Sequence, residues 1–143
     1  MDERETARHL NSGAIHVLRA LRRVDRQAGI TAARLSALSV LVFGGPCTMG
    51  ALAAAEDVAG PTMTRIVDAL EEARLVRRRV LAGAGRPVEV SATAKGDRLM
   101  RRAADRRLDA LITAMGTLSD ADRRRLAGAA PILDRVAAAL LAE

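Results

Sequence analysis

The chain has 143 residues, a length that fits one domain with a buried core but is short for an enzyme with a separate substrate domain. Hydrophobic residues make up 50% of it, yet Phe43 is the only aromatic residue, so the core must be built from aliphatic side chains and methionine. The formal net charge of +6 favours a polyanionic partner.

Arginine supplies almost all of the positive charge, because Lys95 is the only lysine. Arginine suits phosphate groups and guanine edges better than lysine does. A GC-rich genome would produce the same usage, so both explanations stay open. The single Cys47 excludes a disulfide within the chain and fits a reducing compartment. No apolar run approaches the ~20 residues of a membrane span, and no secretory signal is recognisable, which favours a cytoplasmic, nucleoid-associated protein with no membrane partner.

The first predicted element is an amphipathic helix over residues 5–28, which Gly29 terminates. Thr31 can cap a second helix over roughly residues 32–43. The end of that helix is apolar nearly all round, including Phe43, so we expect it to lie in the middle of the core.

Two short helices are predicted after a Gly-Gly-Pro break and a very short strand at Cys47–Thr48. Thr48 can cap the first helix. Gly60 at the N-cap and Pro61 at the first helical position mark the start of the second, over residues 61–73. The apolar positions of the first helix have the spacing of one buried stripe: Met49, Leu52 and Ala53.

The helix over residues 61–73 divides into an apolar face and a polar edge. Its apolar face comprises Met63, Ile66, Val67 and Leu70. Its polar edge comprises Thr62, Thr64, Arg65 and Asp68. A helix divided in this way packs one side into a core and offers the other side to a partner.

An arginine-rich strand, a glycine-rich turn over residues 81–87 and a second strand follow. Strand alternation places Arg78 on the inward face and Arg77 and Arg79 on the outward face. We therefore expect Arg78 to pair with an acid of the preceding helix, and Arg77 and Arg79 to be the freer charges. This order of elements predicts a winged helix-turn-helix, a DNA-reading motif, over residues 31–93.

The last part of the chain is predicted to be helical. Thr93 can cap a long helix over residues 94–116, and Ser119 can open a final helix with acids in its first turn. Pro131 is expected to kink or split that final helix at Ala130.

The predicted fold class is therefore mainly α with a small antiparallel β-wing, in a single domain over residues 1–143. The first and last helices carry apolar stripes that no further sheet covers. Pairing with a second copy would cover them, so residues 1–28 and 94–143 are expected to form a helical dimerisation lobe.

Four motifs, in this order and spacing, resemble the MarR family of bacterial transcription regulators over essentially the whole chain. They are Thr-Met-Gly-Ala-Leu-Ala at 48–53, Pro-Thr-Met-Thr-Arg-Ile-Val-Asp-Ala-Leu at 61–70, Leu-Val-Arg-Arg at 75–78, and Val-Glu-Val-Ser-Ala-Thr-Ala-Lys-Gly at 88–96. The resemblance implies a homodimer whose recognition helices enter major grooves and whose wings reach minor grooves. It also implies a repressor that a small, often phenolic, effector releases from double-stranded DNA.

The resemblance places the polar edge of the 61–73 helix, with Pro61, on the family's reading helix, and Arg86 on an arginine of its wing. The candidate DNA-contacting residues are Thr48, Pro61, Thr62, Thr64, Arg65, Asp68, Arg77, Arg79 and Arg86. Candidate positions for the effector cleft, taken from topology, are His16, Leu38 and Met115.

Two departures from the family pattern stand out. Ala84, Gly85 and Arg86 replace an Asp-Arg-Arg run of the wing, so we expect weaker minor-groove contact from it. Arg74 replaces a glycine after the reading helix. A left-handed arginine would be strained by roughly 1 kcal/mol or more, so this helix is expected to end differently.

No catalytic residue, cofactor or metal site is predicted. His9 and His16 lie two helical turns apart, too far to share a metal. Cys47 has no neighbouring His or second Cys, which favours a buried hydrophobe over a redox sensor. Two alternatives to a specific regulator stay open: a winged-helix protein-interaction module, and a weakly specific architectural DNA binder.

Overall fold

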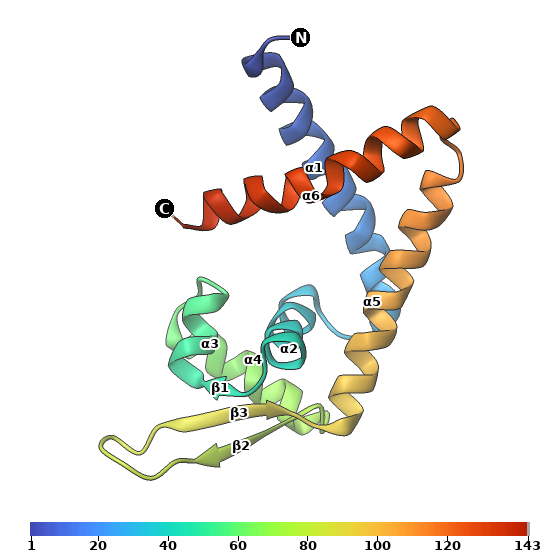
Figure 1. Ribbon diagram of the computed structural model, residues 1–143. Helices are drawn as coiled ribbons and strands as arrows, with labels where there is room; N and C mark the ends of the chain where they lie inside the picture. The colour runs from blue at the N-terminus through green and yellow to red at the C-terminus, as the bar shows by residue number, and fades with distance from the viewer. Residues whose placement is uncertain (143) are drawn as a thin grey trace. The chain divides into compact units, whose positions relative to one another are not determined.

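The computed structural model describes residues 1–142 and confirms the predicted fold class, helices with one small antiparallel sheet (Figure 1). The elements in chain order are α1 (Glu3–Asp25), the short 3-10 helix η1 (Arg26–Ala28), α2 (Ala32–Gly44), β1 (Cys47–Thr48), α3 (Met49–Ala55), α4 (Gly60–Glu72), β2 (Val76–Val80), β3 (Val88–Ala92), α5 (Ala94–Met115) and α6 (Asp120–Leu141). The chain divides into two compact units, Met1–Arg107 and Leu108–Glu143. The DNA-binding and dimerisation lobes named above are functional divisions and stay predictions.

Side-chain caps fix the starts of the helices where the sequence predicted them. The hydroxyl of Thr31 accepts a hydrogen bond from the backbone N–H of Arg34 at 3.3 Å, which starts α2. The hydroxyl of Thr48 accepts one from Ala51 at 3.2 Å, which starts α3. Each bond satisfies one of the backbone donors that a helix start leaves unpaired.

Helix α4 begins one residue earlier than predicted. Its N-cap is Ala59, which has extended backbone angles, and Pro61 is the second helical residue rather than the first. The shift costs no backbone hydrogen bond, because the N–H that proline lacks would have no partner at either position.

The core of the unit Met1–Arg107 is aliphatic. Helices α2, α3 and α4 and the start of α5 pack around the inward faces of the strands. Its fully buried large side chains are Leu38, Leu52, Met63, Val67, Leu70, Leu75 and Val90. The prediction for Phe43 is wrong: the ring is 58% exposed at the end of α2, where the guanidinium of Arg101 lies 5.8 Å from its centroid.

The three strands form an antiparallel sheet in the order β1-β3-β2. Cys47 pairs with Val90, which confirms the very short first strand, and Arg78 pairs with the same Val90 from the other side. Beyond these pairs, the β2–β3 hairpin projects past the helices as a two-stranded wing (Figure 1). Strand β2 lies at the edge of the sheet.

Arg74 adopts the left-handed conformation, with φ of 60°, so the expectation that α4 would end differently is wrong. The N–H of Leu75 donates to the carbonyl of Leu70 at 2.9 Å, and the N–H of Arg74 donates to that of Glu71 at 2.9 Å. These two bonds are the Schellman pattern that usually places glycine at this position. Satisfying two helix-end carbonyls outweighs the strain of a left-handed arginine.

The turn between α4 and β2 is held by the start of α5. The hydroxyl of Thr93 donates to the carbonyl of Arg74 at 2.7 Å, and its N–H donates to the carbonyl of Leu75 at 3.0 Å. The ammonium of Lys95 donates to the carbonyl of Ala73 at 3.0 Å. Gly96 packs so closely that a Cβ built on it would lie 2.0 Å from the carbonyl oxygen of Leu75.

A partly buried ion pair joins α1 to α5 within the same unit. The guanidinium of Arg107 donates to both carboxylate oxygens of Asp25, at 2.7 and 2.5 Å, and Asp25 is only 7% exposed. The hydrogen bonds to Asp25 raise the pKa of Arg107 above its ordinary value and outweigh the opposing effect of burial. The Arg107 guanidinium is therefore a permanent cation in this contact.

Helix α6 runs unbroken through Pro131, so a split at Ala130 does not occur, and the alternative prediction of a kink there stays a prediction. A proline removes one backbone hydrogen bond, and the turns on either side keep theirs. Ser119 caps this helix through the N–H of Asp122 at 3.1 Å. Among the described residues, no single helix is both long and apolar enough to cross a membrane; α1 with η1 and α2 meet those limits only together, as a pair bent by 87°.

Replacing Gly96 by alanine should destabilise the protein by roughly 3 kcal/mol, because the new methyl group would collide with backbone that cannot move aside. Urea unfolding followed by circular dichroism measures this change. Gly50→Ala is the matched control, since a Cβ at Gly50 in α3 meets nothing within 4 Å. That variant should be neutral or slightly more stable, and equal stability of both variants would contradict the packing described here.

Replacing Arg74 by glycine should stabilise the protein by about 0.5–1 kcal/mol, since glycine adopts the left-handed conformation without strain. The midpoint of urea unfolding should rise accordingly. A lower midpoint would mean that the arginine side chain contributes more to the fold than its backbone angle costs.

Candidate nucleic-acid interface

The outer edge of α4 is the candidate reading surface. On its inner side Met63, Val67 and Leu70 have no exposed surface, so the helix is anchored firmly in the core. On its outer side Thr62 and Arg65 are exposed. Within residues 1–142 Arg65 takes part in no ion pair, so its guanidinium is available to a partner.

Thr64 and Thr48 use their hydroxyl groups within the protein. The hydroxyl of Thr64 donates to the carbonyl of Gly60 at 3.1 Å, one turn back along α4. While that bond is kept, the hydroxyl offers only acceptor capacity to a partner. The hydroxyl of Thr48 accepts the capping bond at the start of α3 and retains its proton for donation.

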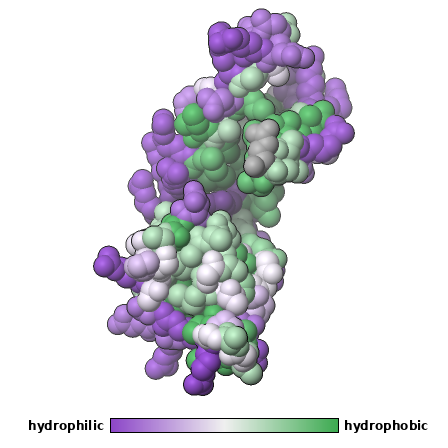
Figure 2. Space-filling view, turned by 90° about the vertical axis from the view of Figure 1, so that its left-hand side faces the viewer, coloured by the Kyte–Doolittle hydropathy of each residue, from purple (hydrophilic) through white to green (hydrophobic). Residues whose placement is uncertain are grey.

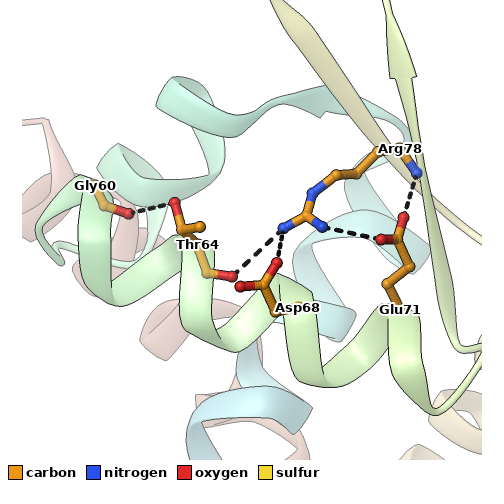
Figure 3. Close-up of polar contacts among 5 residues, drawn as sticks. All are labelled: Gly60, Thr64, Asp68, Glu71 and Arg78. Carbon is orange, nitrogen blue, oxygen red and sulfur yellow. Dashed lines mark hydrogen bonds and ion pairs between the residues drawn. The ribbon is translucent and has the colours of Figure 1, made fainter.

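Asp68 lies on the exposed side of α4, but its carboxylate is bound by Arg78 of β2 at 2.5 Å (Figure 3). Arg78 also binds Glu71 of the same helix at 2.9 Å. The predicted pairing of Arg78 with an acid of the preceding helix is therefore confirmed, with two acids in place of one. Glu71 was missed by the sequence reasoning, although its spacing from Asp68 on the helix was a usable signal.

The charge of Arg78 is held strongly by these neighbours. Partial burial alone would lower the pKa of its guanidinium, but the hydrogen bond to Asp68 and the charges of Glu71 and Asp68 outweigh burial and raise that pKa above its ordinary value. Arg78 is consequently a permanent cation set against two carboxylates.

The wing carries three further arginines. Arg77 is exposed on the outward face of β2, opposite Ser91. Arg79 is freer than Arg78, as predicted, although it pairs across the strands with Glu89 at 3.1 Å. The Arg79 side chain is 70% exposed, and such surface pairs contribute little, so Arg79 can exchange Glu89 for another anion. Arg86 is exposed in the turn with φ of 42°.

Cys47 is half-buried in β1. Burial and the nearby charge of Glu89 both raise the pKa of its thiol above the ordinary value. The thiol therefore stays protonated at neutral pH, and a protonated thiol is a poor nucleophile.

The three effector positions taken from topology stay predictions, and the structure describes the surroundings of each one separately. Leu38 is fully buried in the core and has no surface to offer a ligand. His16 is exposed on α1, and Met115 belongs to the other compact unit. A separate cavity of about 270 Å³ opens within the unit Met1–Arg107. It is lined by Arg22, Asp25, Ala32, Leu35, Ser36, Ser39, Met100 and Arg107.

The chain is similar to known regulators in both sequence and fold. A model of the MarR family matches residues 28–87. An uncharacterized HTH-type transcriptional regulator of Mycobacterium leprae is 33% identical over 127 residues, which cover 89% of each chain.

Two solved structures share the fold. A MarR family protein from Bacillus stearothermophilus is 24% identical with a TM-score of 0.80, covering 96% of this chain and 99% of that one. NadR, solved in complex with 4-hydroxyphenylacetate, is 22% identical with a TM-score of 0.67, and the match covers 90% of this chain and 89% of that one.

The sequence match to the mycobacterial regulator extends over nearly the whole of both chains. The matched family model spans the helix-turn-helix and most of the wing, the segments that include α4 and its exposed outer edge. The chain therefore belongs to the MarR family of DNA-binding transcriptional regulators.

Proposed function

We propose that this protein is a homodimeric repressor that reads a pseudo-palindromic operator through the outer edge of α4. The observation that carries the proposal is the division of α4: three fully buried residues on one side, and exposed Thr62 and Arg65 on the other. Rigid support behind an exposed polar edge is what direct reading of base edges in a major groove requires.

Dimerisation is supported by the apolar surface that each compact unit leaves exposed. In α1 the exposed large apolar residues are Leu10, Ile15, Val17 and Leu18. In the unit Leu108–Glu143 they are Leu108, Ile112, Leu118, Leu126, Ile132, Leu133, Val136, Leu140 and Leu141. Figure 2 shows hydrophobic side chains at the surface where the C-terminal end of α6 faces the viewer. Apolar surface on this scale is typical of an interface between subunits.

The wing arginines would supply contacts to the DNA backbone. Arg77 has no acid opposite it in the sheet, and Arg79 is held only by an exposed pair with Glu89. Arg86 adds a third cation at the turn, where the hairpin extends past the helices (Figure 1). Contacts of this kind position the protein on DNA and carry little sequence information.

Release by a small anion is a second proposed property, favoured by the 270 Å³ cavity of the unit Met1–Arg107. Exposed Arg22 and two serine hydroxyls line the cavity, and no aromatic side chain does. An effector there would be held through an acidic group, whereas stacking on a ring is not available to it. The complex of NadR with 4-hydroxyphenylacetate, which carries a carboxylate, is in keeping with this chemistry.

DNA selected from a random pool by the purified protein should carry a two-fold symmetric motif with half-sites about 10 bp apart, because two recognition helices of a dimer enter successive major grooves. Sequencing of the bound pool gives the motif, and analytical ultracentrifugation gives the mass of the free protein. An asymmetric motif or a monomeric protein would contradict the proposed dimer. A featureless pool would favour an architectural DNA binder, and no bound DNA would favour a protein-interaction module.

Arg65→Ala should weaken binding to the selected site by roughly 1–3 kcal/mol and relax the preference at one position of each half-site, if Arg65 contacts a base edge. Arg77→Ala is the matched comparison, because it removes another exposed arginine, from the wing. It should weaken binding to the selected site and to random DNA by the same factor and lower the salt dependence of binding. Gel-shift titrations at several salt concentrations measure both effects, and unchanged preference in Arg65→Ala would remove Arg65 from the reading surface.

A further inference from the structure

One guanidinium group ties three points along α4 to the wing sheet (Figure 3). The side chain of Arg78 donates to the carbonyl of Thr64 at 3.5 Å, to Asp68 at 2.5 Å and to Glu71 at 2.9 Å. These three positions follow one stripe of the helix and span about two turns. The contacts therefore constrain the direction of the helix axis as well as its distance from β2.

The backbone of β2 takes part in the same connection. One carboxylate oxygen of Glu71 accepts the backbone N–H of Arg78 at 3.2 Å, while its other oxygen accepts the guanidinium at 2.9 Å. Glu71 thus holds the strand itself and not only a flexible side chain. Backbone and side chain of one residue are both fixed to the helix, so α4 and β2 have little freedom to move separately.

The connection reaches the reading edge directly. Thr64, whose carbonyl Arg78 binds, carries its hydroxyl on the outer side of α4, and Arg65 is the next residue. Contacts to base edges need donor and acceptor positions correct to about 0.5 Å. A small rotation of α4 about its support would displace the Arg65 side chain by more than that.

The charge of Arg78 is used within the protein. Its two carboxylate partners exceed its own charge, so this cluster offers no net positive charge to a phosphate. Its side chain is 25% exposed, compared with 70% for Arg79 in the same strand. Arg78 therefore differs in kind from the other wing arginines.

We infer that Arg78 is a positioning residue for DNA recognition: through Thr64, Asp68 and Glu71 it sets the orientation of α4 on the wing and so controls discrimination between operator and random DNA without touching DNA. The inference rests on the proposed reading role of α4. It also explains why an arginine is needed, because a lysine ammonium cannot place several donors along two helical turns at once.

The test uses Arg78→Lys, which keeps the charge and loses the planar fork, and Glu71→Gln, which alters the helix side of the connection at a residue outside the DNA-contact set. Fluorescence anisotropy measures the dissociation constants of both variants for the selected operator and for random DNA over a range of salt concentrations. The discrimination ratio, the dissociation constant for random DNA divided by that for the operator, should fall by roughly tenfold in each variant. Misplacing one base contact predicts a loss of this size. The salt dependence should stay at the wild-type value, since no phosphate contact is lost. Circular dichroism establishes that each variant is folded at the temperature used.

Arg77→Gln is the comparison within the same strand. It should weaken binding to the operator and to random DNA by the same factor, and it should lower the salt dependence of binding. A folded Arg78→Lys or Glu71→Gln protein that keeps the wild-type ratio would overturn the inference, since the cluster would then serve stability alone. A lower salt dependence in Arg78→Lys would overturn it too, because Arg78 would be a phosphate contact. If Arg78→Lys does not fold, the discrimination ratio of Glu71→Gln alone tests the inference: a roughly tenfold fall supports it, and the wild-type ratio overturns it. Failure of the wild-type protein to discriminate would refute the proposed function itself, and the inference with it.

Discussion

The contact between Gly96 and the carbonyl of Leu75 is the constraint on which the winged helix-turn-helix depends. The end of α4, the start of β2 and the first turn of α5 meet there with no room for a methyl group. Thr93 and Lys95 bind the carbonyls of the two residues before Leu75, Arg74 and Ala73 respectively. Helix α4 is consequently fixed at its C-terminal end to α5, and along its length to the wing through Arg78. Its exposed N-terminal half is the part left free to meet a partner.

Periodicity and capping chemistry predicted most of this architecture, because both are local. The threonine and serine caps and the buried stripe of α4 follow from residues within a few positions of each other. The pairing of Arg78 was predictable because strand alternation turns it toward the helix that precedes it. The division of α4 into anchor and edge, which defines the candidate site, was likewise visible in the sequence.

The features that could not be predicted from the sequence depend on contacts between residues far apart in the chain, or on two opposing free energies of similar size. Asp25 and Arg107 are 82 positions apart, and neither has a local signal for the other. The pairing of Arg79 with Glu89 requires the register of the hairpin. The left-handed Arg74 is stabilised by two backbone hydrogen bonds and destabilised by backbone strain. The residue type alone does not tell which of these two free energies is larger. Phe43 shows that hydrophobicity alone does not predict burial. A hydrophobic residue at a helix end is exposed when it does not lie on the face of the helix that packs against the core.

Glu71 has a consequence for solubility. Strand β2 is the edge of a three-stranded sheet, and an edge strand presents unpaired N–H groups on which a strand from another chain can assemble. The Glu71 carboxylate occupies the outward N–H of Arg78 in the middle of that strand. An approaching strand would therefore meet a negative charge where it needs a donor, and it could bond there only by displacing an ionised carboxylate. Helix α4, through Glu71, thus also shields the edge of its own sheet against fibrous self-association.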